Sequence, residues 1–152
     1  MIFIIKRGTK WQFNGIESLQ NIQIGVIANY SYGDTLDGHI LKNSRNPARV
    51  RISFGNDAFG QNIKYLKMGR ITAMAVDHEV MSYYEYQNET DLDFQHAGEI
   101  KALPVSIAFS PVNPKSKDYA AILSAGLQKL RKSGDLKTIL DRYGIQDWET
   151  SN

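Results

Sequence analysis

The sequence predicts an α/β fold: a mostly parallel sheet with helices on both faces. Short apolar runs typical of buried or half-buried strands alternate with segments whose apolar residues recur at helical spacing. The connections between them are short, which favours strand–helix–strand units and a parallel sheet. Apolar residues make up 42% and charged residues 22% of the 152 residues, as expected of a folded domain large enough to bury a core.

Five apolar runs are expected to form strands. The first, Met1 to Ile5, is too short to span a membrane, and its charges follow the apolar run, whereas those of a secretory signal precede it. A strand is the better interpretation of this run. The other four runs are residues 22–28, 49–54, 71–76 and 102–109.

Helices are expected between these runs and after the last of them, over residues 33–42, 57–67, 78–87 and 116–132. Asn56 or Asp57 is placed to cap the second helix. Gly134 suits the left-handed position that ends the longest helix, and Asp135 is placed to cap a further short helix that ends at Gly144.

Charge and composition exclude several function classes. The formal net charge of +2 is too small to indicate nucleic-acid binding. There is no cysteine, hence neither a disulfide nor a thiolate metal site, and the three histidines lack metal-ligand spacing. No glycine pattern of a nucleotide-binding loop is present. We therefore expect no metal and no cofactor.

Three loops that follow predicted strands have the geometry of a ligand site. One of them, Gly55-Asn56-Asp57, is better explained as a turn and helix cap, and the other two carry the candidate ligand-binding residues. Tyr30, Ser31 and Tyr32 follow the second strand and offer a hydroxyl, two rings and a helix N-terminus. Asp77 follows the fourth strand, where its carboxylate is able to accept hydrogen bonds from a ligand ammonium. Both positions also suit simple helix capping, and the pattern alone leaves the two interpretations open.

Two segments resemble known proteins in combination. Gly69 to Asp77 and Gly134 to Gly144 are similar to motifs of bacterial extracellular solute-binding proteins, family 3, the amino-acid receptors of ABC importers. The resemblance implies a periplasmic-binding-protein-like II fold and an N-terminally truncated fragment. It divides the chain into a residual first-lobe strand and crossover (1–19), an α/β second lobe (20–105), and a return crossover with C-terminal helices of the first lobe (106–152).

The resemblance also implies residue roles. Asp77 would hold the α-amino group of the solute, and Ser31 with backbone N–H groups would hold its α-carboxylate. Family members usually carry Gly-Thr where this chain has Asn29-Tyr30, which leaves the identity of the ligand open.

The expected function is capture of an amino acid or related small polar solute, without enzymatic activity, for the membrane permease of a periplasmic ABC importer. Nucleic acid is not an expected partner. Self-association is expected through the apolar face of helix 116–132. The alternatives are the sensing domain of a signalling receptor and a dehydratase-like enzyme on the same fold.

Overall fold

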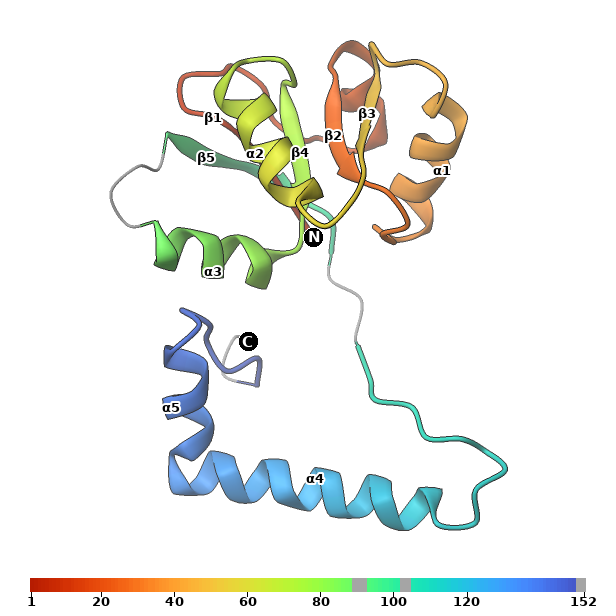
Figure 1. Cartoon of the computed structure of the whole chain (residues 1–152), viewed down its shortest axis with the longest axis vertical. Helices are drawn as coiled ribbons and strands as arrows, with labels where there is room; N and C mark the ends of the chain where they lie inside the picture. The colour runs from red at the N-terminus through yellow and green to blue at the C-terminus, as the bar shows by residue number, and fades with distance from the viewer. Residues whose placement is uncertain (89–92, 102–104, 150–152) are drawn as a thin grey trace. The chain divides into compact units, whose positions relative to one another are not determined.

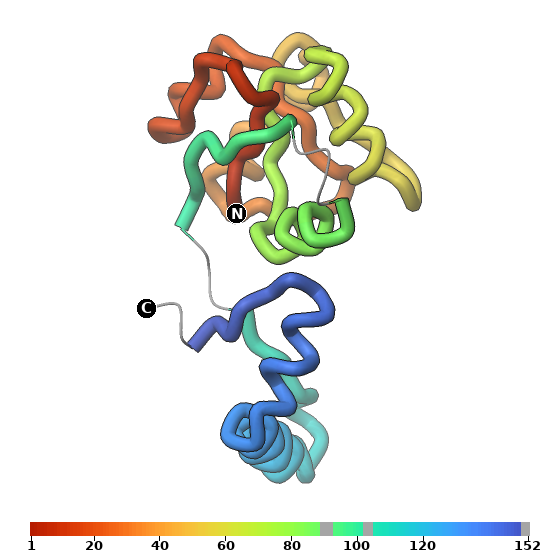
Figure 2. The backbone as a smooth tube through the Cα atoms, turned by 90° about the vertical axis from the view of Figure 1, so that its left-hand side faces the viewer, coloured from red at the N-terminus to blue at the C-terminus, as the bar shows by residue number. Residues whose placement is uncertain are grey.

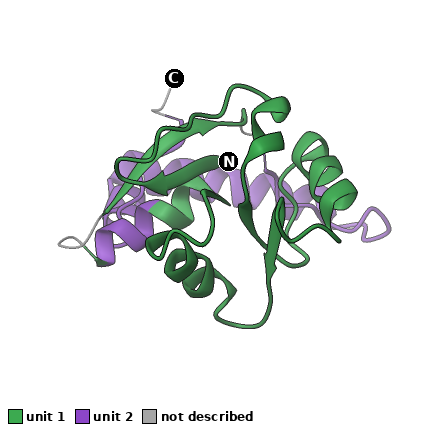
Figure 3. Cartoon of the chain, turned by 90° about the horizontal axis from the view of Figure 1, so that it is seen from above, with its two compact units in different colours: residues 1–81, 88–103 green, residues 82–87, 104–152 purple. Residues whose placement is uncertain are grey.

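The computed structural model describes residues 1–88, 93–101 and 105–149. The chain divides into two compact units, shown in Figure 3. The first consists of residues 1–81 and 88–103 and contains the sheet. The second consists of residues 82–87 and 104–152 and contains the two C-terminal helices.

A five-stranded mixed sheet organises the first unit (Figure 1). Its strand order is β3-β2-β4-β1-β5, and the strands are β1 (Ile2–Lys6), β2 (Ile24–Ile27), β3 (Val50–Ser53), β4 (Ala73–Val76) and β5 (Phe94–Glu99). Strand β2 pairs in parallel with β3 and β4, whereas β1 pairs antiparallel with β4 and β5. Four strands therefore share one direction and β1 runs against them.

The helices are a 3-10 helix η1 (Ile16–Asn21), α1 (Asp34–Asn43), α2 (Ala58–Lys67), α3 (His78–Gln87), α4 (Ser116–Ser133) and α5 (Asp135–Asp141). Alternating side chains of β2 face opposite sides of the sheet. Ile24 and Val26 pack in one core cluster with Leu19 of η1 and Leu36 of α1. The intervening Gly25 faces Asn62 of α2 on the other side. The prediction of an α/β sheet with helices on both faces is confirmed.

Strand β1 differs from its predicted place. The sequence assigns residues 1–19 to a separate lobe, but β1 lies between β4 and β5 in the same sheet and the same compact unit. Phe3 and Ile5 are fully buried, and Ile2 and Ile4 are nearly so. A strand that is apolar on both faces is stable only when both faces are covered, which is the position that β1 occupies.

The fifth strand also differs from the prediction. Residues 105–109, the described part of the predicted strand 102–109, form no strand, and residues 102–104 lie outside the described residues. Val105 and Ile107 are 96% and 71% exposed, so their apolar alternation does not reflect burial. The strand forms instead at β5, where Phe94 and Ala97 are buried.

In the second unit, α4 ends as the sequence predicts. Gly134 has φ 84°, in the left-handed region that glycine adopts at low cost. Asp135 does not cap α5 but is its first residue, and its carboxylate accepts a hydrogen bond from Ser133 Oγ at 2.6 Å. Arg131 of α4 donates two hydrogen bonds to Asp147, from Nε at 2.6 Å and from Nη2 at 2.9 Å. This bidentate pair anchors the segment after α5 to α4.

Helix α4 itself contains no buried residue, and its apolar residues Tyr119, Ile122 and Leu123 are 44%, 67% and 43% exposed. Figure 2 shows the course of the backbone through both units. The exposed apolar residues agree with the expected apolar face of this helix. Self-association through it stays a prediction.

Gly25 gives a test of the packing between β2 and α2. A Cβ atom at this position would lie 2.5 Å from Ile71 Cδ1 and 3.1 Å from Asn62 Oδ1. We expect Gly25→Ala to lower the free energy of unfolding by about 1–3 kcal/mol, the usual cost of overpacking a core. Gly38→Ala is the control, because a Cβ atom there, inside α1, meets open space. It should stabilise the chain by about 0.5–1 kcal/mol. Urea unfolding of both variants checks the pair, and equal stabilities would contradict the predicted clash.

Candidate functional site

A cavity of about 220 Å³ lies where the carboxyl ends of β2, β3 and β4 meet. Loops at this edge of a parallel sheet present helix starts and backbone N–H groups, and ligands of α/β proteins commonly bind there. The cavity is lined by residues that lie at or just beyond the ends of the strands and in the first turns of α2 and α3: Ile27, Tyr30, Tyr32, Gly55, Asn56, Ala58, Phe59, Ala75, Val76, Asp77 and Val80.

Asp77 is the only charged side chain among these lining residues. It follows β4, all of whose residues are buried, and is itself half-buried. Its Oδ1 accepts a hydrogen bond at 3.0 Å from the backbone N–H of Glu79, in the first turn of α3. Its Oδ2 has no protein partner in the described part of the chain. Capping thus uses one carboxylate oxygen and leaves the other to accept from a ligand.

The two tyrosines of the loop after β2 differ in environment. The Tyr30 side chain is 50% exposed, whereas Tyr32 is 4% exposed, and their ring centroids lie 5.8 Å apart. The Tyr32 hydroxyl accepts a hydrogen bond at 2.7 Å from the backbone N–H of Ile27, at the end of β2. Burial raises the pKa of Tyr32 to about 12. Tyr32 therefore forms a neutral wall of the cavity, and Tyr30 presents its ring towards solvent.

The Ser31 side chain does not line the cavity with those of the other predicted site residues. Its hydroxyl donates to Asp37 Oδ2 at 2.8 Å. The backbone N–H of Tyr32 donates to Asp37 Oδ1, also at 2.8 Å. A hydroxyl and a backbone N–H of this loop are thus bonded to a carboxylate, but that carboxylate belongs to the chain itself. The interaction tethers the loop to the first turn of α1.

The cavity is also lined by Phe59 and Val80, which the sequence analysis did not name, and by Asn56, in the loop that it interprets as a turn and helix cap. Phe59 and Val80 lie in the first turns of α2 and α3, directly after β3 and β4. Their positions after strand ends are the signal that identifies them, because neighbouring parallel strands bring such residues to one edge. Phe59 and Val80 add apolar surface to a cavity whose charged group is Asp77.

Within the described ranges 1–88, 93–101 and 105–149, no three His, Asp or Glu side chains are grouped so that they would hold a metal ion. None of the helices seen in these ranges has the length and apolarity needed to cross a membrane.

Comparison with known proteins finds similarity at the level of structure. No protein-family model and no curated protein matches the sequence. An ancestral arginine-binding protein, solved bound to glutamine and bound to arginine, matches 93% of this chain with a TM-score of 0.60 at 23% identity, over 58% of its own length. A mutant of ArgBP from T. maritima matches 93% of the chain with a TM-score of 0.61 at 19% identity, over 56% of its length.

The second substrate-binding domain of a putative amino acid ABC transporter from Streptococcus pneumoniae is a further match. It covers 93% of this chain and 59% of its own, with a TM-score of 0.55 at 20% identity. The chain thus spans less than two thirds of the length of the structures it matches. At these identities the likeness concerns the fold, and the chain has the periplasmic-binding-protein-like α/β fold that the sequence predicts.

Proposed function

We propose that this chain captures a small polar solute that carries a protonated amine, as part of the solute-binding component of an ABC importer for amino acids or related compounds. The observation that carries the proposal is the half-free carboxylate of Asp77 at the edge of the sheet, in a cavity whose lining contains no cation. A carboxylate there attracts an ammonium or guanidinium group and repels a second carboxylate. The cavity is smaller than the roughly 300–1,000 Å³ of drug-sized ligand sites, which suits a solute of amino-acid size.

The proposed roles follow from the contacts. Asp77 Oδ2 accepts from the amine of the solute, and the face of Tyr30 contacts its carbon chain or its cationic group. Tyr32 closes one wall and holds the end of β2. Ser31 has an indirect role: its hydroxyl donates to Asp37 and so fixes the loop.

The similar structures support this assignment. The ancestral arginine-binding protein binds arginine and glutamine, both of which carry an amine, and another of the similar structures belongs to a putative amino acid ABC transporter. A permease partner and a periplasmic location are part of the proposal on the same ground. The proposed role is binding without catalysis, because the described lining residues offer one carboxylate and no second carboxylate, histidine or lysine beside it.

Asp77→Asn tests the proposal. We expect the variant to bind arginine or lysine about 30-fold more weakly than the parent chain, since a charge-assisted hydrogen bond contributes on the order of 2 kcal/mol. Asparagine still accepts from the Glu79 N–H, so the cap of α3 is retained. Amide chemical-shift titrations with arginine, lysine, glutamine and glutamate provide the measurement, because they report weak affinities residue by residue.

Glu79→Gln is the matched control for this variant. It removes one negative charge two residues away from Asp77, on an exposed side chain that does not line the cavity. It should leave the affinities close to those of the parent chain. Equal binding by Asp77→Asn and the parent, or a preference for glutamate over lysine, would refute the amine-binding role.

A further inference from the structure

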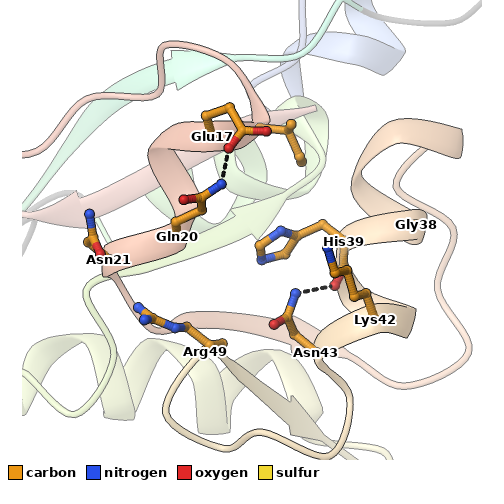
Figure 4. A pocket seen from close by; sticks show the side chains of 9 residues that line it. Glu17, Gln20, Asn21, Gly38, His39, Lys42, Asn43 and Arg49 are labelled. Carbon is orange, nitrogen blue, oxygen red and sulfur yellow. Dashed lines mark hydrogen bonds between the residues drawn. The ribbon is translucent and has the colours of Figure 1, made fainter.

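A second cavity, of about 440 Å³, lies at the opposite end of the sheet from the first. It is bounded by η1, by α1 and by the residues that precede β2 and β3, whereas the cavity at Asp77 follows the ends of these strands. Most of its lining residues carry polar or charged side chains: Ile16, Glu17, Gln20, Asn21, Gly38, His39, Lys42, Asn43 and Arg49 (Figure 4). The proposed solute site leaves this second cavity unexplained.

Charge in this cavity is predominantly positive. Lys42 comes from the last turn of α1 and Arg49 from the residue before β3, and neither forms an ion pair within the described residues. The one acid in the lining, Glu17, accepts a hydrogen bond from the Gln20 amide. At neutral pH two cations therefore face a single carboxylate, which leaves one unbalanced positive charge.

His39 supplies a second, independent observation. Figure 4 shows its imidazole directed from α1 towards η1, between the two sides of the cavity. Its Nε2 is enclosed and has no hydrogen-bond partner in the described part of the chain. Buried polar atoms without a partner are rare in folded proteins. Solvent does not reach Nε2 in this conformation, so a turn of the ring towards the cavity would be needed for a ligand there to complete its hydrogen bonding.

The pKa of His39 reflects the charges that surround this cavity. Its pKa lies below the ordinary value of 6.5, first because of burial and then because of the charges of Lys42 and Arg49, against the opposing effect of Glu17. Those three groups are the charged residues that line the cavity with it, from α1, from the segment before β3 and from η1. The positive field that disfavours a protonated imidazole is the field that attracts an anion.

We propose that the cavity between η1 and α1 is a second binding site, for a small oxyanion carrying a carboxylate or phosphate group, held by Lys42 and Arg49 with His39 as an additional N–H donor. Lys and Arg are the usual partners of such groups, and Asn21, Gln20 and Asn43 offer amide donors on the same lining. The site is independent of the amine site at Asp77, because the two lie at opposite ends of β2 and β3 and share no residue.

Titration of the full chain with inorganic phosphate and, separately, with succinate tests the proposal, each against sodium chloride at matched ionic strength. Amide shifts are expected at η1, at the end of α1 and before β3, with the His39 imidazole signal moving to a higher pKa as the anion binds. Binding should strengthen below the histidine pKa, because protonated His39 then donates to the anion. Binding of phosphate alone indicates a phosphorylated ligand or free phosphate, binding of succinate alone indicates a carboxylate, and binding of both indicates a site that accepts either oxyanion.

Variants separate this site from a general effect of charge. Lys42→Gln combined with Arg49→Gln should weaken the affinity for the bound probe at least about tenfold. Glu17→Gln should strengthen it about two- to fivefold by removing the opposing charge. Lys64→Gln combined with Arg70→Gln makes the same change in net charge outside the lining and should leave the affinity unchanged.

Several outcomes would overturn the proposal: no response of His39 to either probe, equal losses in the two double variants, or weaker binding by Glu17→Gln. None of these outcomes bears on the amine site, because Asp77→Asn is expected to leave the oxyanion titration unchanged. A failure of the amine site would likewise leave this proposal standing.

Discussion

Phe3→Ala is expected to reduce the free energy of unfolding of the first unit by about 3–5 kcal/mol, the usual cost of removing a buried phenylalanine ring. Phe3 is fully buried in β1, between β4 and β5. Its ring stacks on Phe13 with centroids 4.4 Å apart and meets Trp11 edge-on at 5.8 Å. Truncation therefore removes aromatic contacts as well as apolar area and leaves a cavity in the middle of the sheet.

The measurement has to follow the first unit alone. The two tryptophans fall in different units, Trp11 in the first and Trp148 in the second. In a Trp148→Phe background, tryptophan fluorescence during urea unfolding reports on the first unit only. Phe54→Ala is the control, since that ring is 67% exposed and its loss should change stability by less than about 0.5 kcal/mol. Similar losses in the two variants would mean that β1 is not a buried interior strand of this sheet.

Local patterns were sufficient to predict most of the first unit. The apolar runs at 22–28, 49–54 and 71–76 contain β2, β3 and β4, and helical spacing predicted α1 and α2 within one or two residues. The apolar pattern of these elements is strong, because each strand is covered by helices and each helix packs one face on the sheet. The sequence therefore contains enough information for the alternation and for the fold class.

The pairing of strands that lie far apart in the sequence could not be predicted. Strand β5 has only Phe94 and Ala97 buried, and the polar residues between them hide its strand character. The run after it, with Val105 and Ile107, is more apolar but exposed. Which of two segments pairs with β1 depends on contacts between residues more than 80 positions apart, and no local pattern encodes such contacts.

The candidate site was predictable to the extent that it depends on strand ends. Tyr30, Tyr32 and Asp77 line one cavity because parallel strands bring their carboxyl ends to the same edge. The partner of Ser31 was not predictable. Its hydrogen bond to Asp37 follows a turn at residues 28–29, in which Asn29 has a φ of 61°, in the left-handed region. Spacing alone does not reveal such a turn.

Tyr32 is expected to make the chain lose about 3 kcal/mol of stability between pH 10 and pH 12. Its pKa is raised from 10.0 to about 12 by burial, so the folded state retains the phenolic proton longer than the unfolded state. Below pH 10 the hydroxyl is protonated in both states and contributes no pH dependence. Above pH 10 the unfolded chain ionises first, and stability falls by about 1.4 kcal/mol per pH unit until the folded state ionises near pH 12.

Tyr32→Phe isolates this contribution. At neutral pH the variant should be about 1–3 kcal/mol less stable than the parent, because the Ile27 N–H at the end of β2 loses its acceptor. The difference should then fall to about zero or reverse as the pH rises from 10 towards 12, since only the parent has the ionisable hydroxyl at this position. Urea unfolding across this range gives the stabilities, and the difference in tyrosinate absorbance between parent and variant gives the titration of Tyr32 itself. A titration at the ordinary value of 10, or a stability difference that is constant with pH, would show that the Tyr32 hydroxyl is hydrated and does not close a wall of the cavity.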